Sequence, residues 1–310
     1  MILTLTVNPA IDRNVTVDRL VFDDRAYILD TNETPGGRGL NASQVLHSFG
    51  AKTEAVLTAG GDTGSRMRQM LASSGFPVHL VPSASPTRLN MNITDKQGLT
   101  VKLNEKGSPL LPEELRELEK AVHQRLPEAR WMMLCGSLPP GAPEDLYARL
   151  IETARALGVK TLLDTDGEPL QLGLEAHPTV VAPNQQEAER LLGKVLLTRA
   201  QMIDAAERIR MMGAERVLLS LGSRGVMGAE EGRLVEAIPP RVDVVCPIGA
   251  GDALGASFVW SMRRGTDFSD ALRWGVAAGT ASAMLPGVSF ANVEQTREIY
   301  EQVQVRENAR

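Results

Sequence analysis

The chain has 310 residues, of which 43% are hydrophobic and 23% charged, with a formal net charge of −5. This balance excludes a general attraction to nucleic acid or to an anionic membrane, so an anionic ligand would need a local basic cluster. Two cysteines without metal-type spacing, an N-terminus unlike a signal peptide and the lack of a long apolar run predict a cytoplasmic, globular protein.

Short β-rich runs alternate along the chain with segments of helical periodicity. We expect buried strands at residues 3–7, 54–57, 131–135, 159–164, 179–182 and 217–221. Apolar residues at three- and four-residue spacing predict helices at residues 67–74, 112–126, 143–157 and 199–212. This alternation predicts an α/β fold, in which a mainly parallel central sheet is covered by helices on both faces.

Two segments, residues 14–33 and 86–103, break this pattern. In the second segment, apolar side chains alternate with polar ones over residues 89–93, and again over residues 101–103 after a turn. Such short antiparallel strands predict a small sheet beside the main one. Because ligands of open α/β sheets bind at the strand ends, we expect this small sheet to be a lid inserted into one domain, residues 1–310.

The most informative motif is Gly249-Ala250-Gly251-Asp252, which is followed by helical spacing. Asp252 is the only charged residue within 244–262. A helix start offers free N–H groups and a favourable dipole to an anion, and glycines let the backbone approach a phosphate. An Asp at this place can take a proton from an attacking hydroxyl. The alternative is a simple N-cap role, but the apolar surroundings favour function because an uncompensated buried carboxylate is costly.

A second glycine-rich segment, residues 36–41, opens a predicted helix. Its glycines fit the spacing of a dinucleotide-binding motif, with Asp62 roughly twenty residues beyond. That motif should follow a core strand directly, whereas residues 32–35 intervene here. We therefore favour a turn that packs its backbone against a polyol, with Asn41 and Asp12 hydrogen-bonding to hydroxyls. Helix or turn capping is the alternative for either residue alone.

These motifs together resemble those of the ribokinase/PfkB sugar-kinase family, over nearly the whole chain. Residues 36–41 look like its first signature, 249–252 like its second, 184–187 like its N-x-x-E element and 220–225 like its nucleotide-proximal glycine turn. Four motifs in the expected order are a specific signal. The similarity extends to the hexose-phosphate kinase branch (1-phosphofructokinase, tagatose-6-phosphate kinase and the minor 6-phosphofructokinase) at residues 8–12, 86–90, 136–141 and 163–167.

The resemblance implies a ribokinase-like fold, the substrates ATP and a sugar phosphate, Mg²⁺ as cofactor, and a homodimer joined through the lid. It implies Asp252 as the catalytic base, with an anion hole formed by the amides of Gly249, Ala250 and Gly251. The sugar hydroxyls would be bound by Asp12, Gly37 and Asn41. The nucleotide and metal would be held by Asn184, Glu187 (through water), Ser220, Gly222 and Gly225.

A phosphorylated substrate needs a cation site of its own. Arg38 and Arg88 match basic positions of the branch, Arg25 and Lys102 lie in the two lid segments, and Ser137 could donate a further hydrogen bond. Guanidinium groups suit this task because they bind phosphate bidentately and stay charged. For each arginine alone, a solvated surface charge is the alternative. A neutral sugar would leave these cations unpaired under a closed lid and would be rejected.

We therefore expect ATP-dependent phosphorylation of a ketohexose phosphate, either fructose 1-phosphate or tagatose 6-phosphate, to the bisphosphate. The alternatives are a kinase of fructose 6-phosphate, a kinase of an unphosphorylated sugar or nucleoside on the same fold, and a non-catalytic sensor that kept the sugar pocket. Intact Asp252 argues against the sensor. No G-x-x-x-x-G-K-[ST] motif is present, which excludes a P-loop kinase.

The sequence departs from the family pattern at three places. Where the family usually has T-x before G-A-G-D, this chain has Cys246-Pro247-Ile248. The common K-G-x-N element begins with Arg38 instead of lysine. The lysine that often precedes P-N-x-x-E is replaced by Ala182. This last change predicts a weaker contact to the nucleotide phosphates and leaves the reaction class unchanged.

Overall fold

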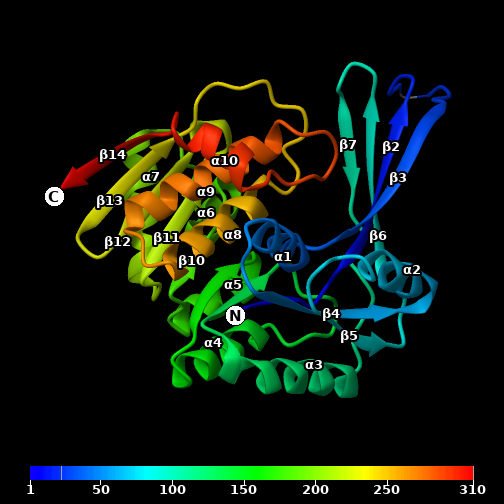
Figure 1. Ribbon diagram of the computed structural model, residues 1–310, viewed down its shortest axis with the longest axis horizontal. Helices are drawn as coiled ribbons and strands as arrows, with labels where there is room; N and C mark the ends of the chain where they lie inside the picture. Colours follow the sequence, from blue (N-terminus) through cyan, green and yellow to red (C-terminus); the bar gives the residue numbers. More distant parts are fainter. Residues whose placement is uncertain (22, 310) are drawn as a thin grey trace.

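The computed structural model describes residues 1–21 and 23–309, which form a ten-stranded sheet and a separate four-stranded sheet (Figure 1). The large sheet has, in order, β14 (Gln304–Ala309), β13 (Arg233–Ile238), β12 (Val226–Glu230), β11 (Arg216–Ser220), β10 (Val180–Val181), β9 (Lys160–Asp164), β8 (Trp131–Cys135), β1 (Ile2–Thr6), β4 (Thr53–Gly60) and β5 (Val78–Ser83). The small sheet has β3 (Ile28–Gly36), β2 (Ala10–Val17), β6 (Arg88–Asp95) and β7 (Thr100–Leu103).

The large sheet is parallel from β5 to β11 and antiparallel from β11 to β14. All six predicted core strands are present, as β1, β4 and β8 to β11. Strands such as β1 and β8 are buried along their whole length, because helices cover both of their faces. This explains why they are continuous apolar runs in the sequence. The prediction of a mainly parallel α/β sheet is confirmed.

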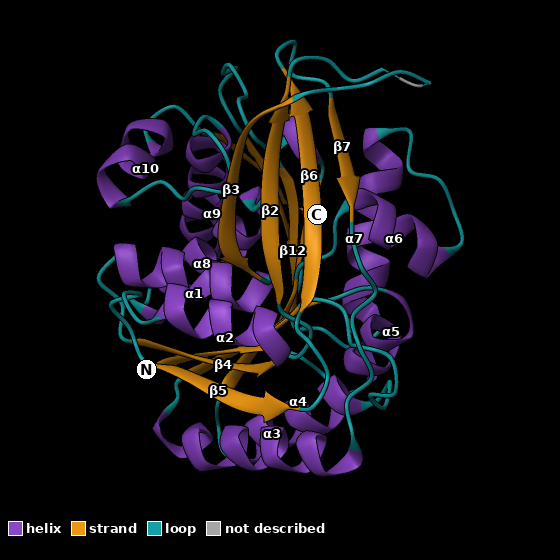
Figure 2. Ribbon diagram, turned by 90° about the vertical axis from the view of Figure 1, so that its right-hand side faces the viewer, coloured by secondary structure: helices purple, strands orange, loops and turns teal. Residues whose placement is uncertain are grey.

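The helices divide between the two faces of the large sheet (Figures 1 and 2). One face carries α1 (Arg38–Ser48), α2 (Gly61–Leu71), α8 (Ala250–Arg263), α9 (Phe268–Ala283) and α10 (Val293–Tyr300). The other face carries α3 (Pro112–Arg125), α4 (Leu146–Ala156), α5 (Gly167–Glu175), α6 (Gln185–Leu192) and α7 (Arg199–Met211). Successive side chains of β1 point to opposite faces of the sheet. Leu3 and Leu5 pack in the hydrophobic core on one face, and Ile2 packs in the core on the other.

The small sheet stands apart from the large one (Figure 1). Its two hairpins, β2–β3 and β6–β7, are antiparallel as predicted, but β2 and β6 pair in parallel, which the sequence analysis did not foresee. The first hairpin also begins earlier than predicted, because β2 starts only a short turn after β1. One face of the sheet is polar and includes Asp12, Asn14, Asn90 and Asn92; the opposite face includes Val15, Val17, Met91 and Ile93.

None of the helices in the described residues is both long enough and apolar enough to span a membrane.

Candidate active site

The candidate site lies where the parallel strands of the large sheet end. Asn8 and Ser137 lie in the turns after β1 and β8, and Asp164 and Ser220 are the last residues of β9 and β11. The N-termini of α1 and α8 supply the two glycine motifs. Chain segments that lie far apart in the sequence therefore meet at one edge of the sheet, as expected for a ligand site of this architecture.

Asp252 is held at the beginning of α8 by a side chain from α1. The Nδ2 atom of Asn41 donates a hydrogen bond of 2.7 Å to Oδ2 of Asp252. The N-cap of α8 is Gly249, with φ of 81°, and Asp252 lies in the first turn. The alternative that Asp252 is only an N-cap is therefore wrong.

Burial, followed by the negative charge of Asp164, raises the pKa of Asp252 to about 7, against the opposing effects of Asn41 and Arg38. A carboxyl group with this pKa can accept a proton near neutral pH.

The start of α8 presents backbone to the site. No side chain caps this helix end, and the first amides of a helix lack intrahelical acceptors. The amide of Ala250 donates a long bond of 3.3 Å to the carbonyl of Pro247. A Cβ atom at Gly251 would meet nothing within 4 Å, whereas one at Gly249 would lie 2.7 Å from Phe290. The turn is thus packed on the Phe290 side and open at Gly251.

The predicted sugar residues meet beside Asp252. Asp12 is buried, and its Oδ1 accepts a 2.8 Å hydrogen bond from Nδ2 of Asn90 on the neighbouring strand. Burial raises the pKa of Asp12, and Asn90 and the positive charge of Arg88 oppose that rise. A Cβ atom at position 36 would lie 2.1 Å from the Asp12 carboxylate, so Gly36 makes room for this side chain.

Several buried polar atoms here lack a hydrogen-bond partner. Seven buried side-chain atoms of the described residues have none, and four of these belong to the root of the small sheet and to α1: Thr34 Oγ1, Asn41 Oδ1, Arg88 Nε and Asn90 Oδ1. Buried polar groups are almost always satisfied in folded proteins. A concentration of unpaired donors and acceptors beside a carboxyl group therefore points to a ligand that carries hydroxyl groups.

The glycine segment before α1 is not a dinucleotide site. Gly37 has φ of 131°, and a Cβ atom there would lie 2.6 Å from Cγ2 of Thr6, so glycine lets α1 begin against the end of β1. The helix follows β3 of the small sheet, not a strand of the large one. Asp62, which would bind the ribose if this were a dinucleotide site, is exposed in the first turn of α2.

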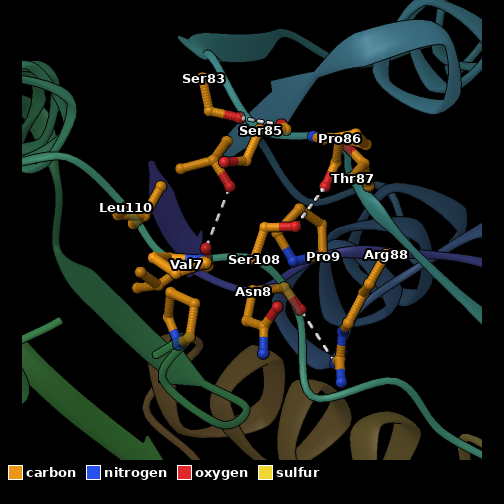
Figure 3. Close-up of a pocket in the computed structure, with 13 residues that line it drawn as sticks. Val7, Asn8, Pro9, Ser83, Ser85, Pro86, Thr87, Arg88, Ser108 and Leu110 are labelled. Carbon is orange, nitrogen blue, oxygen red and sulfur yellow. Dashed lines mark hydrogen bonds between the residues drawn. The ribbon is translucent and has the colours of Figure 1, made fainter. Parts of the chain in front are cut away.

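Arg88 and Ser137 are both hydrogen-bonded to Asn8, and Figure 3 shows the contact of Arg88 with Asn8. The guanidinium of Arg88 donates to the carbonyl oxygens of Asn8 (3.0 Å) and Glu105 (2.8 Å). The Asn8 side chain donates to the carbonyl of Lys106 (3.0 Å) and to Oγ of Ser137 (3.3 Å). Among the described residues no carboxylate is hydrogen-bonded to Arg88, and burial lowers its pKa against the charges of Asp12 and Glu105. This cluster offers a positive charge without a bonded counter-ion.

A small cavity lies beside this cluster, between the turn after β1, the connection from β5 to β6 and the segment that follows β7. It measures about 20 Å³ and is lined by residues that include Ser85, Thr87, Arg88 and Ser108 (Figure 3). That volume suits about one water molecule. It is too small to hold a sugar phosphate.

The other two predicted cations lie further out on the small sheet. Arg25 is exposed in the connection between β2 and β3, beyond the end of β2. At a rise of about 3.3 Å per residue, the end of β2 is roughly 17 Å from Asp12. Lys102 pairs with Asn92, one pleat beyond Asn90 on the polar face. Within this chain, Lys102 is near the site and Arg25 is not.

Arg38 points toward a different part of the site than expected. Its Nη1 donates to Oδ1 of Asp164 at 2.6 Å, and its Nη2 to Oε1 of Glu187 at 3.2 Å. The charges of Asp164, Glu187 and Asp252 raise the pKa of Arg38. Two carboxylates therefore occupy the guanidinium that the sequence analysis assigned to the substrate phosphate. Arg38 and Arg88 therefore do not form a pair of cations that are both without a bonded carboxylate.

The residues that the sequence analysis predicted to bind the nucleotide lie along the ends of β10 and β11. Asn184 caps α6, accepts a bond from the Glu187 amide and pairs with Ser220 in an isolated parallel bridge. The following turn, Gly222–Arg224, is exposed, and Gly225 has φ of 94°. A Cβ atom at Gly225 would lie 2.0 Å from the Ala237 carbonyl oxygen. These residues form a shallow, open edge with backbone accessible at the turn.

The sequence analysis did not single out Asp164, Asn8, Asn90 or Thr34 as site residues. Asp164 and Asn8 each follow a buried strand, which is the usual signal for a residue at the ligand-binding edge. Asn90 and Thr34 lie directly across from Asp12 in the two neighbouring strands. Their signal is present in the alternating pattern, but only the strand register identifies it.

The architecture and the site together define a sugar kinase of the ribokinase-like class: the carboxyl group of Asp252 lies at a glycine-rich helix N-terminus, beside unpaired buried polar atoms at the root of a small sheet. The pfkB family carbohydrate kinase model matches residues 5–295. The chain therefore belongs to this family, and it is a phosphotransferase that acts on an alcohol group of a carbohydrate.

Relatives and solved structures agree with this assignment. The 1-phosphofructokinase of Borreliella burgdorferi is 31% identical over 92% of both chains. The ATP-dependent 6-phosphofructokinase isozyme 2 of Escherichia coli is 28% identical over 96% of this chain and 97% of its own. Phosphofructokinase-2 from Escherichia coli superposes with a TM-score of 0.91 at 28% identity, over 97% of this chain and 98% of that one. The ribokinase of Arabidopsis thaliana, at 20% identity and a TM-score of 0.78 over 97% and 98% of the two chains, shares the fold.

Proposed function

We propose that this protein transfers the γ-phosphoryl group of ATP to a hydroxyl of a ketohexose phosphate and so forms a bisphosphate. The observation that carries the proposal is the pairing of Asp252 with Asn41, beside an uncapped helix N-terminus. The four unpaired buried polar atoms at this place support a polyol acceptor. Fructose 1-phosphate and tagatose 6-phosphate are the preferred acceptors, and fructose 6-phosphate is the alternative, since the relatives include both kinds of phosphofructokinase.

In the proposed reaction, Asp252 accepts the proton of the acceptor hydroxyl while that oxygen attacks the γ-phosphorus in line with the leaving oxygen. Asn41 orients the carboxylate through its Nδ2 and can accept a sugar hydroxyl at its unpaired Oδ1. The amides at Gly249 and Gly251 and the dipole of α8 would stabilise negative charge on the transferred group. Asp12 and Asn90 would fix further hydroxyls, so that the reacting one faces Asp252.

The phosphate of the acceptor would bind at Arg88 and Ser137. Arg88 is bonded only to carbonyl oxygens and retains an unpaired Nε. Ser137 accepts a hydrogen bond from the side chain of Asn8, and the backbone carbonyl of Asn8 accepts one from Arg88. Lys102 can extend this site from the polar face of the small sheet, which would close over the acceptor as a lid. Closure would exclude water and strengthen the charge interactions of the site.

The nucleotide would lie along Asn184, Ser220, Gly222 and Gly225. The residues present fit Mg²⁺ held through water, because the nearby carboxylates already have hydrogen-bond partners. One oxygen of Glu187 accepts from the Asn184 amide and the other from Arg38, and Oδ1 of Asp164 accepts from Arg38. No cluster of three or more metal-ligating side chains occurs in the described residues, and Mg²⁺ usually keeps several water ligands beside phosphate oxygens. The bound ion would neutralise charge on those oxygens.

The test is ADP release from MgATP with a panel of fructose 1-phosphate, fructose 6-phosphate, tagatose 6-phosphate, fructose, ribose and adenosine. We expect turnover confined to a phosphorylated ketohexose. Turnover only with neutral compounds would contradict the acceptor-phosphate site at Arg88 and leave Asp252 as base. A protein that binds these ligands without any turnover would be a sensor.

We further propose a homodimer joined through the small sheets. Tyr27, Ile28, Leu29 and Leu103 of this sheet are exposed. A hollow of about 470 Å³ on its apolar face is lined by Val15, Val17, Ile28, Thr31, Met91, Ile93, Arg13 and Glu33. A second copy would cover this surface and the open sheet edges. Sedimentation of the wild type as a dimer and of Ile28→Asp as a monomer would support this; a monomeric wild type would contradict it.

A further inference from the structure

The guanidinium of Arg38 joins the acceptor half of the site to the nucleotide half. Arg38 is the first residue of α1, the helix that carries Asn41. Its two partners belong to other elements: Asp164 is the last residue of β9, and Glu187 lies in the first turn of α6. The contacts span 126 and 149 residues of sequence. Arg38 thus fixes α1 relative to the edge along which the nucleotide would lie.

Both carboxylates depend on this one cation. In the described part of the chain, Arg38 is the only ion-pair partner of Asp164 and of Glu187. Glu187 is nearly inaccessible, with 3% of its side chain exposed, and burial raises its pKa against the effect of Arg38. Without Arg38, the buried Glu187 and the partly buried Asp164 would face the phosphates of an incoming nucleotide. Their repulsion and desolvation would oppose nucleotide binding.

Position 182 is the other place from which a cation could reach these carboxylates. The Ala182 amide donates to the Leu163 carbonyl at 3.0 Å, directly after the paired residues Val181 and Leu163. Ala182 and Asp164 are therefore neighbours at the ends of adjacent strands. Ala182 is also only five residues before Glu187. A lysine at position 182 could extend into the space between the two carboxylates, but alanine leaves that charge to Arg38.

We propose that Arg38 is a positioning residue for the nucleotide, which pairs with Asp164 and Glu187, offsets part of their negative charge and supplies the positive charge that Ala182 does not. The proposal rests on the proposed kinase function, because it concerns the nucleotide half of that same site. It differs from the prediction made from the sequence, in which Arg38 binds the phosphate of the acceptor.

The test compares Arg38→Met with Ala182→Lys and with the double variant. Affinity for Mg-AMP-PNP is measured by calorimetry without sugar, and the KM values for MgATP and for the accepted sugar phosphate are measured separately. We expect Arg38→Met to weaken Mg-AMP-PNP roughly 10- to 100-fold, as for loss of an outer-shell partner of a metal site. The KM for the sugar phosphate should change less than about threefold. Adding Ala182→Lys to Arg38→Met should restore most of the affinity.

Arg149→Met is the matched control. Arg149 also bridges two carboxylates, Glu119 and Asp145, but on the surface of α3 and α4 away from the site. Its loss should leave nucleotide affinity unchanged, and circular dichroism checks the fold of every variant. Should Arg38→Met fail to fold, Arg38→Lys, alone and with Ala182→Lys, takes its place with the same direction of effect.

Two results would overturn the proposal. One is a rise in the KM for the sugar phosphate with unchanged nucleotide affinity, which would return Arg38 to the acceptor site. The other is a double variant that binds no better than Arg38→Met. Because the calorimetry needs no turnover, a wild type that binds Mg-AMP-PNP but phosphorylates nothing would contradict the kinase function, while Arg38 could still be assessed.

Discussion

The two arginines of the candidate site, Arg38 and Arg88, differ in the groups to which they are hydrogen-bonded. Arg88 is bonded to carbonyl oxygens, and burial lowers its pKa. Arg38 is bonded to two carboxylates, whose charges raise its pKa. The first arrangement leaves Arg88 without a hydrogen-bonded carboxylate among the described residues, although the charges of Asp12 and Glu105 act on it, whereas the second pairs one guanidinium with two carboxylates. The comparison shows that the partners of a cation, more than its residue type, decide what it can bind.

Asp252 connects the regions around these two arginines. Its carboxylate is bonded to Asn41 beside the sugar pocket, while its pKa responds to Asp164 and Arg38 on the nucleotide side. The experiments below separate the contribution of each region. They are ordered from the largest expected effect to the smallest.

Replacing the base should have the largest effect. We expect Asp252→Asn to lower kcat by at least ~10²-fold with a modest change in both KM values, because the amide cannot accept the proton. Steady-state kinetics with the best acceptor of the panel measure this. Turnover near that of the wild type would remove Asp252 from the role of base.

Replacing the free cation should act on one substrate only. Arg88→Met should raise the KM for the sugar phosphate by roughly 30-fold, the scale of a lost charged hydrogen bond, and leave nucleotide affinity unchanged. The control is Arg66→Met, which removes an arginine paired with Glu33 outside the site. An equal loss of affinity for both substrates would mean that the two regions are not distinct.

The pH dependence should distinguish the arginines as well. Because the base acts when ionised and its pKa is raised to about 7, kcat/KM should rise with pH through 7 and fall about tenfold between pH 8 and pH 6. Arg38 lowers the pKa of Asp252, so Arg38→Met should move this limb to higher pH. Arg88→Met should leave it in place. A limb that stays near pH 4 to 5 in all variants would exclude Asp252 as the titrating group.

The architecture of the large sheet was predictable because its signals are local. Strands covered on both faces are continuous apolar runs, as in β1 and β8, and helices such as α3 and α7 carry their own periodicity and N-terminal signals. The antiparallel edge from β12 to β14 was not predicted. Its pairing joins β13 to the C-terminal strand across about seventy residues, and no short-range pattern specifies such a partner.

The sequence by itself determined the family and both glycine turns, and it singled out Asp252 as the candidate base. These features depend on residue types that the chemistry and the backbone require at fixed spacing: glycine where φ is positive, as at Gly37 and Gly249, and a carboxylate at the start of α8.

Only the tertiary structure decided which side chains share a partner. Asn90 reaches Asp12 through strand register, and Arg38 meets Asp164 and Glu187 across more than a hundred residues. The charge that surrounds an arginine is set by such long-range contacts, which composition and spacing do not encode.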